Sequence, residues 1–206
     1  MATDNKHHFM IQLENVQLSF DGKVILKDLS FHVEKGRNVC VSGPSGIGKS
    51  SILRMLQGYI IPDAGHILVG GVLLTKDTVK DIRSEMAYVP QNINLPVYSG
   101  VELMALLLLE SRTELIEHYI EELGLEKEMT QRSFDEISGG EKQRIIISVC
   151  LSLGRKILLL DEPTSSLDDE SIGRIIKVIR NLSDVTVVSA SHNPEWIRAM
   201  DYSIDL

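Results

Sequence analysis

The sequence predicts an α/β protein with a parallel sheet covered by helices on both faces, a smaller antiparallel β subdomain and a helical insertion. Three observations predict this fold class. In the C-terminal half, strands that are continuous apolar runs, such as "KILLL" and "VTVV", alternate with helices, as in a sheet buried on both faces. The N-terminal segments on either side of Asp21-Gly22 instead alternate apolar and polar residues, which indicates an antiparallel pair. Between these regions, residues 92–136 show a leucine-rich helical pattern.

The elements follow in order from these patterns. The first half is expected to form strands at 10–20, 24–33 and 38–43, a helix from Lys49 to 58, a strand pair within 66–74 and a strand at 85–91. The second half is expected to form strands at 156–162, 185–191 and 201–206, with helices at 169–182 and 194–200. Before them, Ser138 and Glu141 form a capping box that opens another helix, and Gly154 ends it.

Composition limits the classes of protein that the chain can represent. Its 206 residues fit one domain, and 21 Lys plus Arg against 29 Asp plus Glu give a formal charge of −8. That charge, with no run of basic residues, argues against a nucleic-acid partner. No apolar stretch approaches the ~20 residues that span a bilayer. The N-terminal segment "MATDNKHHFM" lacks the apolar core of a secretory signal peptide, so we expect a cytoplasmic protein. Cys40 and Cys150 lie in apolar surroundings and are expected to be buried free thiols.

A phosphate-binding loop follows the third predicted strand. "GPSGIGKSS", Gly43 to Ser51, contains G-x-x-x-x-G-K-S between a buried strand and an apolar helix. Its glycines allow backbone N–H groups to converge on phosphate oxygens, and Lys49 can reach the β- and γ-phosphates. The Ser50 hydroxyl can bind Mg²⁺. The loop therefore predicts a P-loop NTPase that uses ATP or a similar nucleotide.

Two carboxylates end a buried strand in "KILLLDEP", where open α/β sheets bind their ligands. Because adjacent residues of a strand point to opposite sides, Asp161 is expected to serve Mg²⁺, through a water, and Glu162 to act as general base on the attacking water. His192 follows the next predicted strand, so its imidazole can point at the γ-phosphate.

The stretch "ISGGEKQR" places two glycines at the start of a helix, although each costs about 1 kcal/mol relative to Ala. Capping explains Ser138 and Glu141 but leaves Gly139 and Gly140 without a reason. A helix N-terminus without side chains in the way can bind an anion, so this end is predicted to contact one.

Together these motifs resemble the ATP-binding cassette (ABC) ATPases over essentially the whole chain. "GPSGIGKSS" is similar to the Walker A loop, "ILLLDEP" to the Walker B strand, and "ISGGEKQR" to the family's signature. The resemblance implies a RecA-like core at about 1–91 and 156–206, with a helical subdomain at about 92–155 in a single domain. It adds Gln91 of "YVPQ" as a catalytic and Mg²⁺-contacting residue and Asp168 of "SSLD" as a nucleotide contact. Phe20 takes the position at which an aromatic side chain stacks on adenine.

The site residues that the motifs and the resemblance imply form three sets. The predicted catalytic residues are Gln91, Glu162 and His192, and the predicted metal contacts are Ser50, Gln91 and Asp161. The predicted nucleotide contacts are Phe20, Gly43, Pro44, Ser45, Gly46, Ile47, Gly48, Lys49, Ser50, Ser51, Ser138, Gly139, Gly140 and Asp168. ATP and Mg²⁺ are the implied ligands.

The resemblance also implies partners. In this family two copies pack head to tail, and the signature of one contacts the γ-phosphate held by the other. A transport ATPase without a spanning helix would work with a separate membrane permease, on the cytoplasmic face of the membrane. Residues 92–111 are the expected docking surface, with Leu95, Val97 and Tyr98 exposed. The alternative function is a soluble ABC ATPase in assembly or DNA-associated work. Only 46 residues lie between Gln91 and Ser138, too few for the long coiled coils of the chromosome-organising type.

Overall fold

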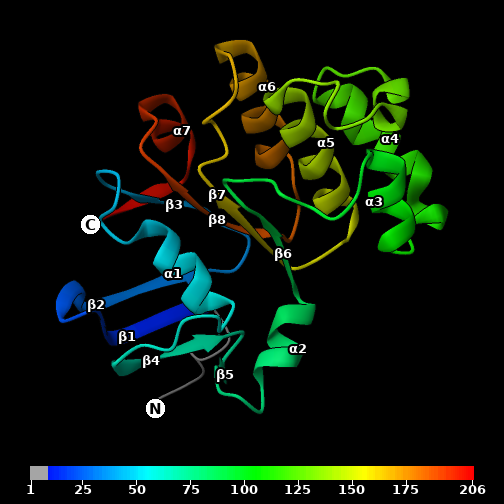
Figure 1. Cartoon of the computed structure of the whole chain (residues 1–206). Helices are drawn as coiled ribbons and strands as arrows, with labels where there is room; N and C mark the ends of the chain where they lie inside the picture. Colours follow the sequence, from blue (N-terminus) through cyan, green and yellow to red (C-terminus); the bar gives the residue numbers. More distant parts are fainter. Residues whose placement is uncertain (1–8) are drawn as a thin grey trace.

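Two sheets organise the computed structural model, which describes residues 9–206 (Figure 1). The smaller sheet is antiparallel, with strand order β2-β1-β4-β5. Its strands are β1 (Phe9–Phe20), β2 (Lys23–Glu34), β4 (Ala64–Val69) and β5 (Val72–Leu73). The β1–β2 hairpin turns at Asp21 and Gly22, both with positive φ, as the Asp-Gly pair predicts.

The larger sheet is parallel, with strand order β6-β7-β8-β3-β9. Its strands are β3 (Asn38–Ser42), β6 (Met86–Val89), β7 (Ile157–Asp161), β8 (Thr186–Ser191) and β9 (Tyr202–Asp205). Strands β7 and β8 are buried throughout, which explains why their sequences are continuously apolar or small. The predicted pairing of the Asp161 strand with the strand before His192 is confirmed.

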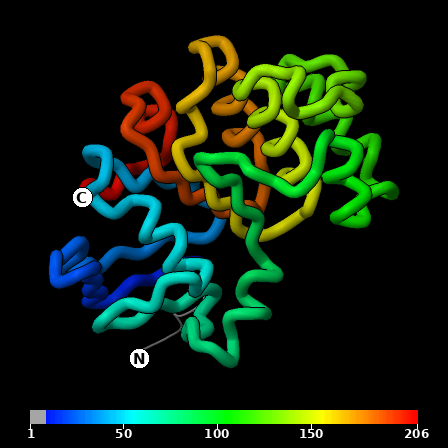
Figure 2. The backbone as a smooth tube through the Cα atoms, viewed as in Figure 1, coloured from blue at the N-terminus to red at the C-terminus, as the bar shows by residue number. Residues whose placement is uncertain are grey.

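The helices take separate places around the sheets. They are α1 (Lys49–Leu56), α2 (Val79–Ser84), α3 (Gly100–Leu106), α4 (Thr113–Glu122), α5 (Gly139–Ser152), α6 (Asp169–Arg180) and α7 (Pro194–Ala199). Two 3₁₀ turns, η2 (Glu110–Arg112) and η3 (Lys127–Gln131), flank α4. Helix α1 lies between the two sheets, whereas α3, α4 and the N-terminal part of α5 gather at the far end of the molecule, away from the antiparallel sheet (Figure 2).

The parallel sheet separates two hydrophobic cores, and β7 contributes to both. Leu158 and Leu160 pack with apolar side chains of α4 to α7, whereas Ile157 and Leu159 pack with α1 and the antiparallel sheet. This alternation is the period of two that a strand imposes on its side chains. The α/β fold class with an antiparallel β subdomain is therefore confirmed.

Three local expectations were incomplete. Helix α2, six residues long and largely polar, was not expected because it is too short to show helical periodicity. Residues 92–99 form no helix, and Leu95 and Val97 pack partly buried against the core with Ile93, so the expectation that they are exposed is wrong. Tyr98 is exposed, at 73 %.

Both cysteines are free; Cys40 is buried, but Cys150 is only partly so. No helix among residues 9–206 has the length and hydropathy to span a membrane.

Candidate functional site

The loop between β3 and α1 has the backbone of a phosphate cradle. Gly43, Gly46 and Gly48 all have positive φ, and Gly48, the N-cap of α1, lies at +121°. A Cβ at Gly48 would lie 2.8 Å from the Ile25 side chain. Both this close contact and the positive φ therefore favour glycine over other residues at this position. No side chain caps α1, and its first turn holds no acidic residue. Its free N–H groups are therefore open to an anion.

Lys49, the first residue of α1, closes the loop. Its side chain is buried, and Nζ donates to the carbonyl oxygens of Gly43 at 2.9 Å and Pro44 at 3.1 Å. Nζ also lies 3.4 Å from Oε1 of Glu162, whose carboxylate is buried too. A buried ammonium needs such partners, and here they hold it at the mouth of the cradle.

Asp161 ends β7 and faces α1. Its carboxylate is 2 % exposed, and each oxygen accepts a hydrogen bond: Oδ1 from the Ser50 hydroxyl at 2.8 Å and Oδ2 from the Tyr88 hydroxyl at 3.2 Å. Burial, and then the adjacent Asp161 carboxylate, raise the pKa of Tyr88 to about 12, so the phenol keeps the proton that it donates. Sequence reasoning paired Ser50 with Asp161 but missed Tyr88, since strand register is not visible in one sequence.

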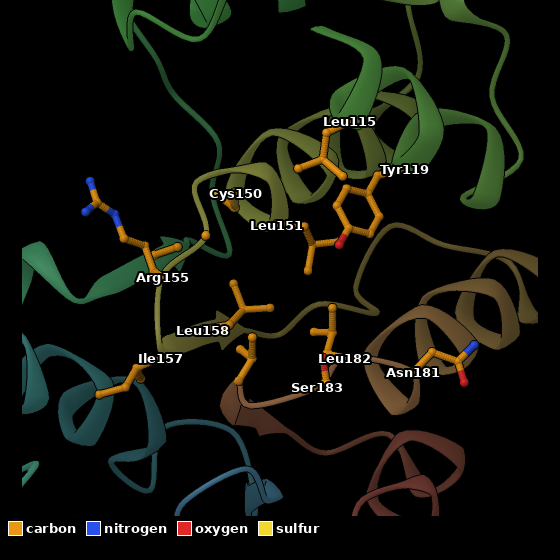
Figure 3. Close-up of a pocket in the computed structure, with 13 residues that line it drawn as sticks. Leu115, Tyr119, Cys150, Leu151, Arg155, Ile157, Leu158, Asn181, Leu182 and Ser183 are labelled. Carbon is orange, nitrogen blue, oxygen red and sulfur yellow. The ribbon is translucent and has the colours of Figure 1, made fainter. Parts of the chain in front are cut away.

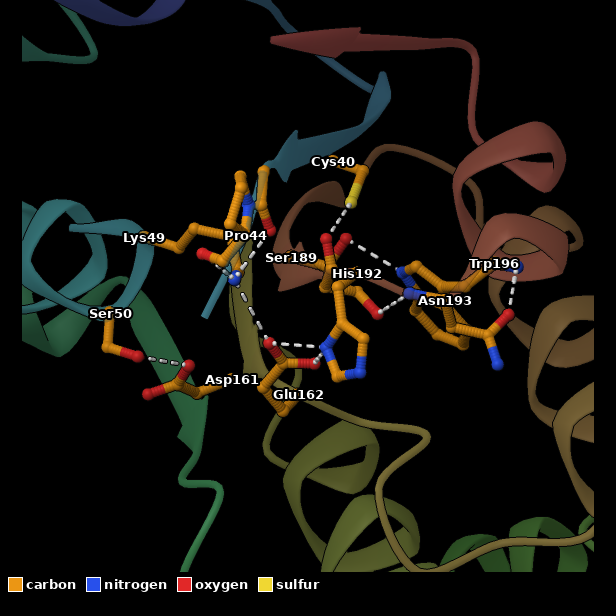
Figure 4. Close-up of polar contacts among 12 residues, drawn as sticks. Cys40, Pro44, Lys49, Ser50, Asp161, Glu162, Ser189, His192, Asn193 and Trp196 are labelled. Atoms are coloured by element: carbon orange, nitrogen blue, oxygen red, sulfur yellow. Dashed lines mark hydrogen bonds and ion pairs between the residues drawn. The ribbon is translucent and has the colours of Figure 1, made fainter. Parts of the chain in front are cut away.

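Glu162 lies on the opposite side of the strand end, as adjacent residues should. It has φ of +48°, an uncommon value for a residue with a side chain, and its N–H donates to Ala190 of β8 at 2.8 Å. Nδ1 of His192 lies 3.0 Å from Oε2 and 3.1 Å from Oε1 (Figure 4). Lys49, Glu162 and His192 thus form one chain of polar contacts across the carboxyl ends of β3, β7 and β8.

A cavity of about 270 Å³ opens above the loop. All but Ile25 of its ten lining residues are predicted site residues: Phe20, Ser45, Gly46, Gly48, Lys49, Ser50, Ser51, Gln91 and Glu162. The Phe20 ring is 46 % exposed at the end of β1, so it offers a face for stacking rather than filling the core. Gln91, two residues after the end of β6, also lines the cavity.

The oxygen atoms near Asp161 suit a magnesium ion. The Ser50 hydroxyl and the buried Asp161 carboxylate lie in contact, and Gln91 lines the same cavity as Ser50. Mg²⁺ prefers such hard oxygen ligands and usually takes only one or two carboxylates, the rest being phosphate and water. No group of three or more His, Cys, Asp or Glu side chains able to hold a metal occurs in residues 9–206.

The predicted signature residues lie at the N-terminus of α5 and line no part of that cavity. The capping box is confirmed: the Ser138 hydroxyl and N–H both donate to Oε2 of Glu141 at 2.8 Å, and the Glu141 N–H donates back at 3.2 Å. These bonds from Ser138 lower the pKa of Glu141. Asp168 is also separate from the cavity; it caps α6 by accepting from Ser171 N–H at 2.8 Å. The Ser171 side chain, and then this N–H, lower the pKa of Asp168.

The two signature glycines have different surroundings. A Cβ at Gly140 would lie 2.7 Å from the backbone carbonyl oxygen of Ser166, a distance that real Cβ atoms do not show. A Cβ at Gly139 would meet only the Ser166 side chain, at 3.6 Å, an ordinary contact. Packing within the chain therefore explains Gly140 and leaves the exposed Gly139 unexplained.

A second cavity, of about 250 Å³, lies at the opposite end of β7 between α4, α5 and the C-terminal end of α6 (Figure 3). Leu115, Tyr119 and Leu151 supply much of its apolar wall. Arg155 at its rim donates to the carbonyl of Ser84. It contains none of the predicted site residues.

Comparison with known sequences gives one family. The sequence model of the family described as "ABC transporter" matches residues 26–165. Two relatives are each 34% identical to this chain: the linearmycin resistance ATP-binding protein LnrL of Bacillus subtilis (strain 168), over 91% of this chain, and the energy-coupling factor transporter ATP-binding protein EcfA1 of Bacillus licheniformis, over 82%. This chain spans 63% of the length of each of them.

Comparison with solved structures agrees. A dimeric ATP-binding cassette in a post-hydrolysis state, bound to ADP and Pi, superposes with a TM-score of 0.84 at 25% identity, covering 96% of this chain and 94% of that chain. A bacterial Atm1-family ABC exporter with ATP bound gives a TM-score of 0.86 at 28% identity, covering 99% of this chain and 38% of that chain.

Proposed function

Because the chain belongs to the ABC transporter family of ATP-binding proteins, we propose that it binds and hydrolyses ATP to drive a transporter. The observation that carries the proposal is the meeting of Lys49, Ser50, Asp161, Glu162 and His192 at the carboxyl ends of three adjacent strands. Open α/β sheets bind ligands at this edge. The relatives and solved structures above, which are named as ATP-binding proteins or contain ATP or its products, support the same function.

ATP occupies the cavity above the phosphate loop. The loop from Gly43 to Ser51 directs backbone N–H groups and the open end of α1 at the phosphates, and Phe20 stacks on the adenine. Ser50, Asp161 and Gln91 would hold Mg²⁺, which would offset charge on the phosphates. Lys49 leaves the carbonyl groups of the loop for phosphate oxygens, which bind an ammonium more strongly because they are charged.

Glu162 is the base that takes a proton from the attacking water, and His192 holds its carboxylate. Oε1 of Glu162 lies 3.4 Å from Nζ of Lys49 and 3.1 Å from Nδ1 of His192. Movement of Lys49 to the phosphates frees that oxygen for water, while the contact from His192 fixes the orientation of the carboxylate. Binding of ATP thereby prepares the base.

A second copy completes the site. The N-terminus of α5, with Ser138 and Gly139 exposed, provides N–H donors and the positive end of a helix dipole, but no residue of α5 lines the cavity of its own chain. The proposed ligand of this helix end is the γ-phosphate bound by the partner copy, with Asp168 at the same interface. The match to a cassette solved as a dimer supports this arrangement.

The remaining partner is a separate membrane-spanning permease, which places the chain at the cytoplasmic face of the membrane. The energy-coupling factor transporter ATP-binding protein and the ABC exporter among the matches support this assignment over an assembly or DNA-associated role. Tyr98 and the exposed leucines that end α3, Leu106 and Leu108, form the proposed docking surface.

Glu162→Gln tests the proposal. We expect the variant to bind ATP, to hydrolyse it about 1,000-fold more slowly because the base is lost, and to accumulate as a dimer with ATP and Mg²⁺, measured by light scattering after gel filtration. Glu85→Gln, which alters a surface ion pair with Lys156 (2.9 Å), is the control and should keep the wild-type rate. A variant that hydrolyses ATP at the wild-type rate, or stays monomeric in saturating ATP, contradicts the proposal.

A further inference from the structure

Tyr88 contacts the proposed metal carboxylate although no sequence motif assigned it a role. It lies on β6, three residues before Gln91. Its hydroxyl donates to Oδ2 of Asp161 at 3.2 Å, while the Ser50 hydroxyl donates to Oδ1 at 2.8 Å. The two oxygens of one buried carboxylate are thus held by two hydroxyl groups from different elements.

Strand register places Tyr88 there. In the parallel β6–β7 ladder Tyr88 pairs with Leu159, two residues before Asp161. Because side chains of a strand alternate between faces, Leu159 and Asp161 share the face of the sheet that α1 covers. Tyr88 packs against the same core and is long enough to reach its diagonal neighbour across the strand pair. A phenylalanine here would fill the same space without donating a hydrogen bond.

We infer that Tyr88 is a positioning residue that orients Asp161 for the Mg²⁺ of bound ATP, an inference that rests on the proposed function. Without the tyrosine hydroxyl, Oδ2 would keep none of the hydrogen bonds to it found among residues 9–206, and Asp161, at 2 % exposure, has little access to water. The carboxylate would then be held by Ser50 alone and would be free to rotate, which changes the direction that its oxygens face. Hydrogen bonds to a ligating carboxylate commonly change metal affinity by about 10–100-fold.

Tyr88→Phe separates this role from a purely structural one. The chain offers a matched control in Tyr202, whose hydroxyl also donates a 3.2 Å hydrogen bond, to the carbonyl of His32, with no site residue involved. Phenylalanine keeps the ring of either tyrosine, so packing is preserved and thermal unfolding should change little. Each variant loses one hydroxyl and one hydrogen bond of the same length.

The readout is the affinity for a fluorescent ATP analogue, measured once in EDTA and once over a series of Mg²⁺ concentrations. We expect wild type and Tyr202→Phe to show the same affinity in EDTA and the same half-saturating Mg²⁺ concentration. Tyr88→Phe should match them in EDTA but need about tenfold more Mg²⁺. The Mn²⁺ electron paramagnetic resonance spectrum of the nucleotide complex should change only in Tyr88→Phe.

The outcomes decide between the two proposals. A Tyr88→Phe variant with the wild-type Mg²⁺ requirement, or with equal losses in EDTA and in Mg²⁺, overturns the positioning role and leaves the ATPase proposal standing. If the wild-type protein binds no ATP analogue with or without Mg²⁺, the proposed function is wrong, and the inference fails with it.

Discussion

Two glycine-flanked helix ends, those of α1 and α5, have opposite surroundings. The end of α1 follows Gly48, carries no side-chain cap, and opens into a cavity bordered by Lys49, Ser50 and Glu162. The end of α5 follows Ser138 and is closed by a carboxylate of its own chain, that of Glu141. The end of α1 therefore lies beside charged side chains. At the end of α5, the N–H groups of Ser138 and Glu141 are already hydrogen-bonded within the chain.

The difference shows what each glycine motif is for. At α1 the positive-φ backbone of the glycines and the nearby lysine explain one another, because both suit a phosphate. At α5 the capping box explains Ser138 and Glu141, and the Ser166 carbonyl explains Gly140, but neither explains Gly139. The proposed contact with a second copy would give Gly139 a reason.

Lys49→Ala gives the largest expected effect on ATP binding and tests whether the α1 end is the nucleotide site. Loss of the ammonium should weaken ATP binding by about 100-fold or more, since hydrogen bonds to charged groups are strong. Binding is measured by titration calorimetry. Lys156→Ala, which removes the surface pair with Glu85 just before β7, is the control and should bind normally. Wild-type affinity in Lys49→Ala would mean that the loop does not hold phosphate.

Gly139→Asp tests the partner contact at α5. A carboxylate at this exposed position should repel the γ-phosphate of the second copy and slow steady-state ATP hydrolysis by about 100-fold. The affinity of the single chain for ATP should not change, because Gly139 does not line its cavity. Gly173→Asp on α6, where a Cβ also has open space, controls for an added charge on a helix. Equal rates in the two variants would remove the reason to link Gly139 with catalysis.

Gly140→Ala sharpens the contrast between the paired glycines. A methyl group 2.7 Å from the Ser166 carbonyl oxygen should lower the free energy of unfolding by about 1–3 kcal/mol, as overpacking does. Gly139→Ala should leave it unchanged or raise it by up to about 1 kcal/mol, because alanine favours the helix. Urea denaturation measures both. Equal stabilities would show that the approach of Ser166 does not explain Gly140.

Glu141→Gln gives the smallest expected effect and is read from its pH dependence. Because the folded state lowers the pKa of Glu141 below its usual 4.5, the carboxylate stabilises the fold above that pH. This stabilisation is lost as the pH falls from 4.5 through the lowered pKa. The side chain is exposed, so we expect less than about 1 kcal/mol. The difference in unfolding free energy between wild type and variant should shrink from pH 7 to pH 3, and a constant difference would contradict the assignment.

Local patterns made most of the elements and one half of the site predictable. The phosphate loop, the acidic end of β7 and the capping box each depend on residues close together in the chain, so their spacing alone predicts their geometry. The positions of Leu95 and Val97 could not be predicted in this way, because their partial burial comes from packing against the core with Ile93.

The sequence by itself determined the order of the elements, the chemistry of Lys49, Asp161 and Glu162, and the start of α5 at Ser138. Only the tertiary structure decided that Tyr88 reaches Asp161 and that the Ser166 carbonyl forbids a side chain at Gly140. The physical reason is range: caps and turns form between residues a few positions apart, whereas register and close approach join residues brought together by packing of the whole chain.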